Sequence, residues 1–151
     1  MLQEKVNSAI VPAGVKQIET LKSVMQESIN RGLMKEYNPP VEHLFCKGMY
    51  ARKNIVPAAH TVITKIHARE HICIVLYGTC HVYDQDGKRN TVTGPEMFVT
   101  KAGTLRAIYC ETETSWINVH WSETESVEEI ESQIFEETYE DYQRRIERLE
   151  H

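Results

Sequence analysis

Side chains that can bind metals or anions alternate with apolar ones between residues 60 and 78. Lys65 and His67 lie two residues apart, and His71 follows four residues later. The residues around them are rich in Val, Ile and Thr, which is typical of strands. Because side chains two apart on a strand share one face, Lys65 and His67 are predicted to point the same way. His71, at the start of the next strand, would then join them in one cavity.

A third histidine extends this predicted site from a distant part of the chain. Residues 115–121 also alternate, which puts His120 on the face opposite Trp121. In a small barrel the interior is lined from several strands. If the His120 face lines that interior, His120 completes a triad with His67 and His71.

The first interpretation of such a triad is a metal site. Neutral imidazoles of His67, His71 and His120 would hold one divalent ion, with water or substrate in the remaining positions. An all-histidine set suits zinc, iron, nickel or copper. A protonated Lys65 cannot ligate a metal and would repel a nearby cation.

The second interpretation is a metal-free cavity that binds an anionic or polar small molecule. Arg106 would form a bidentate contact with a carboxylate or phosphate, and Lys65 would supply a second positive charge. His67 or His71 would be the general base if the protein is an enzyme. A third interpretation is a ligand sensor or an assembly module without catalysis. The residues do not decide among the three, nor whether the protein is an enzyme.

The elements that must position these side chains are predominantly strands. Strands are predicted over residues 44–54, 61–67 and 71–77, the last two pairing as antiparallel neighbours across a break at 68–70. Turn signals at regular spacing then separate five further strands, predicted over residues 79–83, 89–93, 96–100, 105–110 and 115–121. This pattern predicts an all-β sandwich or barrel of antiparallel strands.

Helices are predicted on both sides of the strands. Apolar residues recur at helical spacing from Val15 to Ile29, and again in residues 125–148. We therefore expect one domain: an N-terminal helix and linker over 1–43, a barrel over 44–122, and an acidic C-terminal helix over 123–148. Residues 149–151 resemble the start of a purification tag.

Composition narrows the class of protein. A chain of 151 residues with a net charge of −5 has room for one ordinary globular domain. Residues 123–148 hold ten acidic and three basic residues, so the acidity belongs to the tail. Bases are not clustered as in nucleic-acid binders, and no long apolar run suggests export or a membrane. We expect a cytoplasmic protein whose four scattered cysteines are reduced and buried.

The spacing of the first cluster resembles a known family motif. The first motif of the cupin family has two histidines two residues apart, then a Glu, then a Gly. These four positions fall on Lys65, His67, His71 and Gly78, with both gaps of the right length. The second motif is similar to the stretch from Gly94 to Arg106, where Arg106 stands in place of the usual histidine.

The resemblance covers roughly residues 44–121 and implies a single cupin-type antiparallel β-barrel, or jelly roll. It implies a metal held in the barrel, although cupins that act on nucleotide sugars without metal match the second interpretation. Small cupins with this pattern also resemble uncharacterised proteins encoded by bacteriophages. Since open barrels leave edge strands, and the N-terminal helix has a wide apolar face, we predict a homodimer that uses the helical ends.

Overall fold

The computed structural model describes residues 11–150, which form a mostly β structure with three helices. The helices are α2 (Ala13–Asn30), α3 (Val127–Ile134) and α4 (Tyr139–Glu150). None of these helices combines the length and apolar character that a membrane span requires. The strands are β1 (Val41–Cys46), β2 (Met49–Val56), β3 (His60–Ile63), β4 (Ile66–His67), β5 (His71–Tyr77), β6 (Thr79–Asp84), β7 (Arg89–Thr93), β8 (Glu96–Thr100), β9 (Arg106–Cys110), β10 (Thr114–Trp121) and β11 (Phe135–Glu136).

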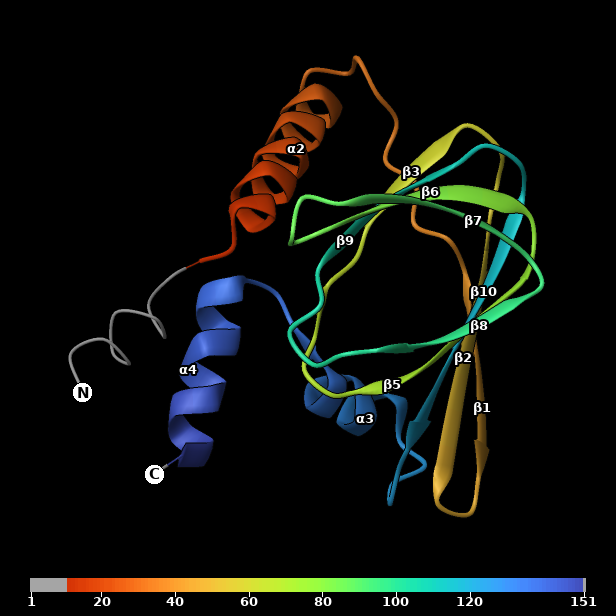
Figure 1. Ribbon diagram of the computed structural model, residues 1–151, viewed down its shortest axis with the longest axis vertical. Coiled ribbons are helices and arrows are strands. Elements are labelled where there is room, and N and C mark those ends of the chain that lie inside the picture. The colour runs from red at the N-terminus through yellow and green to blue at the C-terminus, as the bar shows by residue number, and fades with distance from the viewer. Residues whose placement is uncertain (1–10, 151) are drawn as a thin grey trace.

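Two larger antiparallel sheets carry the fold. One has the strand order β1-β2-β10-β5-β8 and the other the order β3-β9-β6-β7, while β4 and β11 form a separate pair. In Figure 1 the two larger sheets enclose the interior, with α2 and α4 on the side away from β1 and β2. The arrangement is consistent with a cupin-type jelly roll. Within residues 11–150 the strands form separate sheets, and the predicted barrel is not closed.

The predicted strand over residues 61–67 is broken, and its predicted pairing is wrong. Residues 64 and 65 lie between β3 and β4, and these strands pair with β9 and β11. Both edges of β5 are occupied by β10 and β8, so no edge is left for either of them. The break coincides with two hydrogen bonds, from Thr64 N to Arg106 O at 2.9 Å and from Arg106 N to Thr64 Oγ1 at 3.0 Å.

The predicted first strand, over residues 44–54, is a hairpin. Strand β1 begins at Val41, inside the predicted linker, and β2 returns beside it after a turn at Lys47 and Gly48. Gly48 has a φ of 82°, a conformation that glycine adopts without the penalty other residues incur. The turn therefore depends on a glycine in the middle of the predicted strand.

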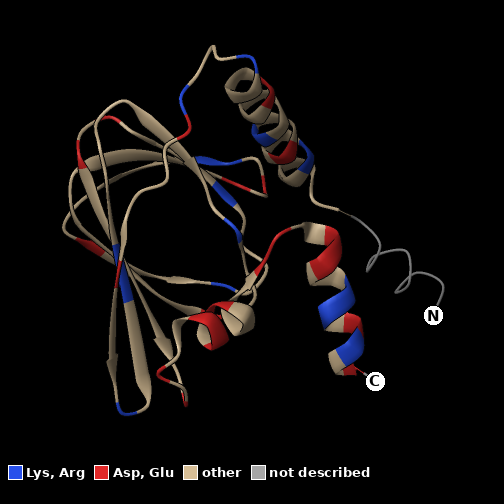
Figure 2. Cartoon of the chain, turned by 180° about the vertical axis from the view of Figure 1, so that it is seen from behind, with Lys and Arg blue, Asp and Glu red and all other residues tan. Residues whose placement is uncertain are grey.

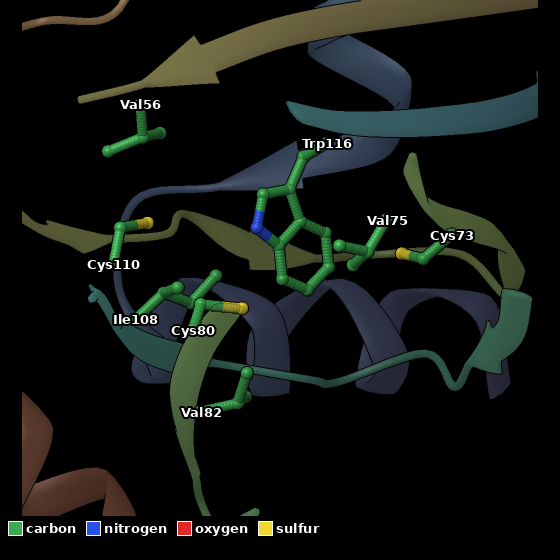
Figure 3. Packing of buried hydrophobic residues seen from close by; sticks show 8 residues of the cluster. All are labelled: Val56, Cys73, Val75, Cys80, Val82, Ile108, Cys110 and Trp116. Atoms are coloured by element: carbon green, nitrogen blue, oxygen red, sulfur yellow. The ribbon is translucent and has the colours of Figure 1, made fainter. Parts of the chain in front are cut away.

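The main core lies between the two larger sheets. Trp116 from β10 is 5% exposed and contacts buried residues from both sheets (Figure 3). The members of this cluster are Val56, Cys73, Val75, Cys80, Val82, Ile108, Cys110 and Trp116. Three of the four cysteines are buried and Cys46 is exposed; all four are free thiols. The prediction of buried thiols is therefore wrong only for Cys46, which lies at the end of β1.

Helix α2 packs on the four-stranded sheet through its first turns. Val15 and Ile18 are buried, whereas Val24 near its other end is 54% exposed. Gly14 N donates to Gln85 O at 2.9 Å, and a side chain at position 14 would overlap that carbonyl. This close approach explains why glycine is needed at the point where the helix meets the sheet.

The predicted single C-terminal helix is two helices separated by a strand. At Phe135 the backbone is extended, with φ −126° and ψ 150°, and β11 pairs there with His67 and Ile66 of β4. Helix α3 buries Ile130 and Ile134, whereas α4 has no buried residue and shows mixed charges along its length (Figure 2). The extended pairing with β4 interrupts the helix and places Phe135 beside the cavity described below.

A capping interaction at the start of α3 leads to the first testable prediction. Ser126 Oγ accepts a hydrogen bond from Glu129 N at 3.3 Å. Replacing Ser126 by Ala should lower the free energy of unfolding by about 1 kcal/mol, because one amide of the first turn loses its partner. Urea unfolding measures this change. Ser132→Ala is the control, since Ser132 lies within the exposed part of the same helix; an equal loss in both variants would contradict the capping role.

Candidate functional site

Three histidines from three strands lie together in the interior. His67 is on β4, His71 on β5 and His120 on β10, and each is 5% exposed or less. The ring centroids of His67 and His71 are 4.6 Å apart, and those of His71 and His120 are 4.2 Å apart. Strand β4 is fixed by the hydrogen bond from His67 N to Thr104 O at 3.0 Å. Alternation along β5 and β10 directs the other two rings to the same side.

The three imidazoles belong to a longer row of rings. His120 stacks on Tyr50 at 6.2 Å between centroids, and Phe135 lies 5.6 Å from His67 at the other end. Tyr50 is fully buried, and its hydroxyl lies 2.7 Å from Nδ1 of the exposed His43. The row therefore runs from the start of β11 through the interior to the surface at His43 of β1.

A hydrogen-bond network connects this row to Arg106. His71 Nδ1 donates to Arg69 O at 3.0 Å, which leaves its Nε2 as an acceptor 3.5 Å from Cys73 Sγ. Cys73 Sγ lies 2.9 Å from Thr100 Oγ1, which accepts from Arg106 Nη1 at 2.9 Å. The thiol also donates to Asn118 Oδ1 of β10, at 2.8 Å. The network places a guanidinium within two hydrogen bonds of the buried thiol.

The histidines are neutral at ordinary pH. Burial lowers the pKa of His67 well below its usual 6.5, and the nearby His71 and Arg106 lower it further. Burial also lowers the pKa of His71. The pKa of His120 falls to about 3, mainly through burial and then through His71 and Arg69. Within residues 11–150, His67 Nδ1 and both ring nitrogens of His120 are buried and have no hydrogen-bond partner.

The arrangement of the three imidazoles does not fit a metal ion. No group of three or more His, Cys, Asp or Glu residues within 11–150 is placed so that it could hold one. His71 and His120 stack with 27° between their planes, and both ring nitrogens of His71 already lie near other groups. These placements give the metal role of His67, His71 and His120 no support, and that role stays a prediction.

A cavity of about 160 Å³ lies beside His67. It is lined by Arg52, Asn54, Val56, Val62, Thr64, Lys65, His67, Arg106, Ile108, Trp116, Asn118, Glu131 and Phe135. Neither His71 nor His120 is in this lining, so His67 is the one imidazole of the three that contacts the cavity. The volume is that of about five water molecules at ~30 Å³ each.

The two arginines of the cavity differ in their partners. Arg52 Nη1 lies 3.3 Å from Glu131 Oε2, and its guanidinium lies over the ring of Phe135 at 4.6 Å. Arg106 is half-buried, and no carboxylate among residues 11–150 forms an ion pair with it. The cavity thus contains one guanidinium whose charge no described acidic side chain balances.

Lys65 stands at the rim of the cavity and does not point to the histidines. Its Nζ lies 2.8 Å from Glu137 Oε1, and half of its side chain is exposed. The predicted shared face of Lys65 and His67 required one continuous strand, and the break at residues 64 and 65 removes that condition. The positive charge of Lys65 is therefore directed to Glu137.

Four cavity or network residues were not singled out from the sequence. Cys73 and Asn118 share a face with His71 and His120 because each is two residues away, so alternation alone could have found them. Thr100 and Arg52 could be placed near the site only by knowing which strands pair in the folded sheet. Thr100 stands opposite His71, and Arg52 opposite Asn118, in strand registers that depend on the folded sheet.

No protein-family model matches the chain, and no curated protein is similar enough in sequence to count as a match. Solved structures with a similar fold exist. One is the plu4264 protein of Photorhabdus luminescens, with a TM-score of 0.50 and 13% identity over 76% of this chain and 89% of that one.

Two other solved structures belong to bacterial proteins. A protein of Salmonella typhimurium LT2 described as an ethanolamine utilization protein Q has a TM-score of 0.50 and 15% identity, over 60% of this chain and 74% of that one. A Cupin 2 conserved barrel domain protein of Salinispora arenicola CNS-205 has a TM-score of 0.48 and 13% identity, over 59% and 80%. At such identities the likeness concerns the fold alone.

Proposed function

We propose that this protein binds a small carboxylate in the cavity between its two larger sheets, without a metal ion. The observation that carries the proposal is the half-buried Arg106, which lines the cavity and has no acidic partner among the described residues. A guanidinium matches the planar, two-oxygen geometry of a carboxylate. Its hydrogen bond to Thr100 Oγ1, at 2.9 Å, fixes one side of the group and leaves other N–H donors for a ligand.

The rest of the lining suggests the shape of the ligand. Arg106, Asn118 and His67 give one part of the wall its polar groups, and apolar residues of the main core give the other part its surface. These apolar residues are Val56, Val62, Ile108 and Trp116. A ligand with one carboxylate and a compact apolar body would satisfy both parts.

The electrostatics favour binding over proton-transfer catalysis. A general base works best when its pKa lies near the working pH. The pKa of His67, the imidazole that lines the cavity, is lowered well below its usual value by burial and by the charges of His71 and Arg106. His67 is therefore a weak base, although its ring remains a good hydrogen-bond partner for a ligand.

The proposal is tested by isothermal titration calorimetry with a series of monocarboxylates, from acetate to benzoate. At least one of them should bind to the wild-type protein. Arg106→Gln should weaken that binding by tenfold or more, because a hydrogen-bonded charge contact contributes about 1.5–3 kcal/mol. Lys88→Gln is the matched control, since it removes an exposed positive charge from the outer surface and should leave the affinity unchanged.

Two results would contradict the proposal. One is equal carboxylate affinity in the wild-type protein and Arg106→Gln, or binding by neither. The other is one equivalent of metal in protein purified without a metal-affinity column, lost on replacing His67 or His120 by Ala, which would favour the metal interpretation. Amides of the same acids serve as uncharged probes and should bind weakly.

A further inference from the structure

The outer face of the five-stranded sheet is unusually apolar. Alternation directs one set of side chains into the core and the other set outward. Seven of the outward residues are large, apolar and between 43% and 71% exposed: Leu44, Met49, Ile72, Leu76, Met97, Val99 and Trp121. Single exposed apolar residues are ordinary, but a contiguous group of them marks an interaction surface.

The strand registers show that these side chains adjoin one another. Ile72 stands opposite Val99 on one neighbouring strand and opposite Val119 on the other. Trp121 stands opposite Met49 in the same sheet. The apolar surface therefore continues across all the strands from β8 to β1. We call it the outer apolar face.

The outer apolar face has almost no net charge. At the outward positions of the five strands, the charged residues are Glu42 and Lys53, which pair with each other at 2.7 Å. Arg69 lies at the rim, over the ring of Trp121 at 4.1 Å. In Figure 2 these strands are mostly tan, whereas α3 is mainly red and α4 carries both colours. Two such faces can meet without repulsion.

The size of the face is close to the minimum that a dimer interface needs. Five strands about 4.8 Å apart, each about six residues long at ~3.3 Å per residue, span roughly 20 Å by 20 Å. Side-chain relief raises the accessible area above the projected ~400 Å². A specific interface needs about 500 Å² from each partner as a minimum. No described helix lies on the face, since α2 contacts the other sheet and α3 packs on Tyr50.

We infer that the outer apolar face is the interface of a homodimer, in which the same face of a second copy of this chain covers it. An uncharged apolar surface is complementary to itself, as a two-fold interface requires. This places the dimer contact away from helix α2, contrary to the helical ends predicted from the sequence. Because the cavity opens elsewhere, the inference stands independently of the carboxylate proposal.

Light scattering of the full chain at micromolar concentration tests this inference. The wild-type protein should have twice the mass of one chain, and Ile72→Glu should have the mass of one, because a buried charge would lack a partner. Val24→Glu, on the exposed part of α2, is the matched control and should remain a dimer.

Other outcomes would overturn the inference. A monomeric wild-type protein would do so, as would dissociation by Val24→Glu with Ile72→Glu still dimeric. Far-ultraviolet circular dichroism shows whether Ile72→Glu is folded. If it is not, Met97→Lys decides the question, because Met97 is 69% exposed and its replacement disturbs the sheet least. A folded, dimeric Met97→Lys together with a dimeric Val99→Lys would also count against the face.

Discussion

Lowering the pH from about 7 to about 5 is expected to destabilise this protein by several kcal/mol, which is much more than its exposed ion pairs explain. The cause is the buried histidine row. The pKa of His120 is lowered to about 3 by burial and by the charges of His71 and Arg69, and the pKa values of His67 and His71 are lowered as well.

The direction follows from proton binding. In the unfolded chain each histidine has a pKa near 6.5, so below that pH the unfolded state binds protons that the native state excludes. The stabilisation is complete above about pH 6.5 and is lost as the pH falls toward the native pKa. For His120 alone the loss at pH 5 is about 2 kcal/mol, and His67 and His71 add to it in the same direction.

Urea unfolding at a series of pH values between about 7 and 5 measures this dependence. His120→Gln should flatten the profile, because one of the three titrating groups is gone. His60→Gln, outside the row, should leave it unchanged. A stability that does not change over this range, or an identical slope in His120→Gln, would show that the histidines are solvated in the native state.

Replacing Gly78 by Ala should have the second large effect, a loss of more than about 3 kcal/mol or of soluble expression altogether. Gly78 joins β5 to β6 with a φ of 97°. A Cβ at this position would overlap the carbonyl oxygen of Glu113 and lie 2.6 Å from Thr114 Cα. Because both obstacles are backbone atoms of the neighbouring chain segment, no side-chain rotation relieves the overlap.

Gly87→Ala separates backbone strain from steric overlap. Gly87 also has a positive φ, of 78°, but no atom lies within 4 Å of an added Cβ. Its replacement should therefore cost only the conformational penalty of about 1–2 kcal/mol. Thermal or urea unfolding of the two variants gives the comparison. A Gly78→Ala variant no less stable than Gly87→Ala would refute the overlap.

Alternation predicted most strands of this fold, and it did so because each strand has one buried face. Strand β5 has the predicted bounds, and β7, β8 and β10 differ by one residue at most. Pairing was harder to predict, since it depends on which edges are free in the folded sheet. The residues around Thr64 give no sequence signal for the break, because the hydrogen bond there joins Thr64 Oγ1 to the distant backbone amide of Arg106.

The candidate site was predictable where it rests on alternation and not where it rests on contacts between sheets. His67, His71 and His120 gather as their strand positions suggest. Lys65 does not join them, because β3 ends at Ile63, two residues before it, and Glu137, from a segment predicted as helix, binds it. Arg106 lines the cavity and donates a hydrogen bond to Thr100. The spacing of residues in the sequence does not predict that Thr100 is its partner.

The unpartnered ring nitrogens of His67 and His120 lower the stability of this fold. Each buried polar atom without a partner costs about 1–3 kcal/mol, and an apolar residue of similar shape would avoid that cost. Trp116 Nε1 of the main core also lacks a partner, so the described part of the interior is locally frustrated both in the histidine row and at the cavity wall. Local conflict of this kind concentrates at working sites, where stability is exchanged for activity. In this protein unpartnered nitrogens of His67 and Trp116 lie in the wall of the candidate cavity itself.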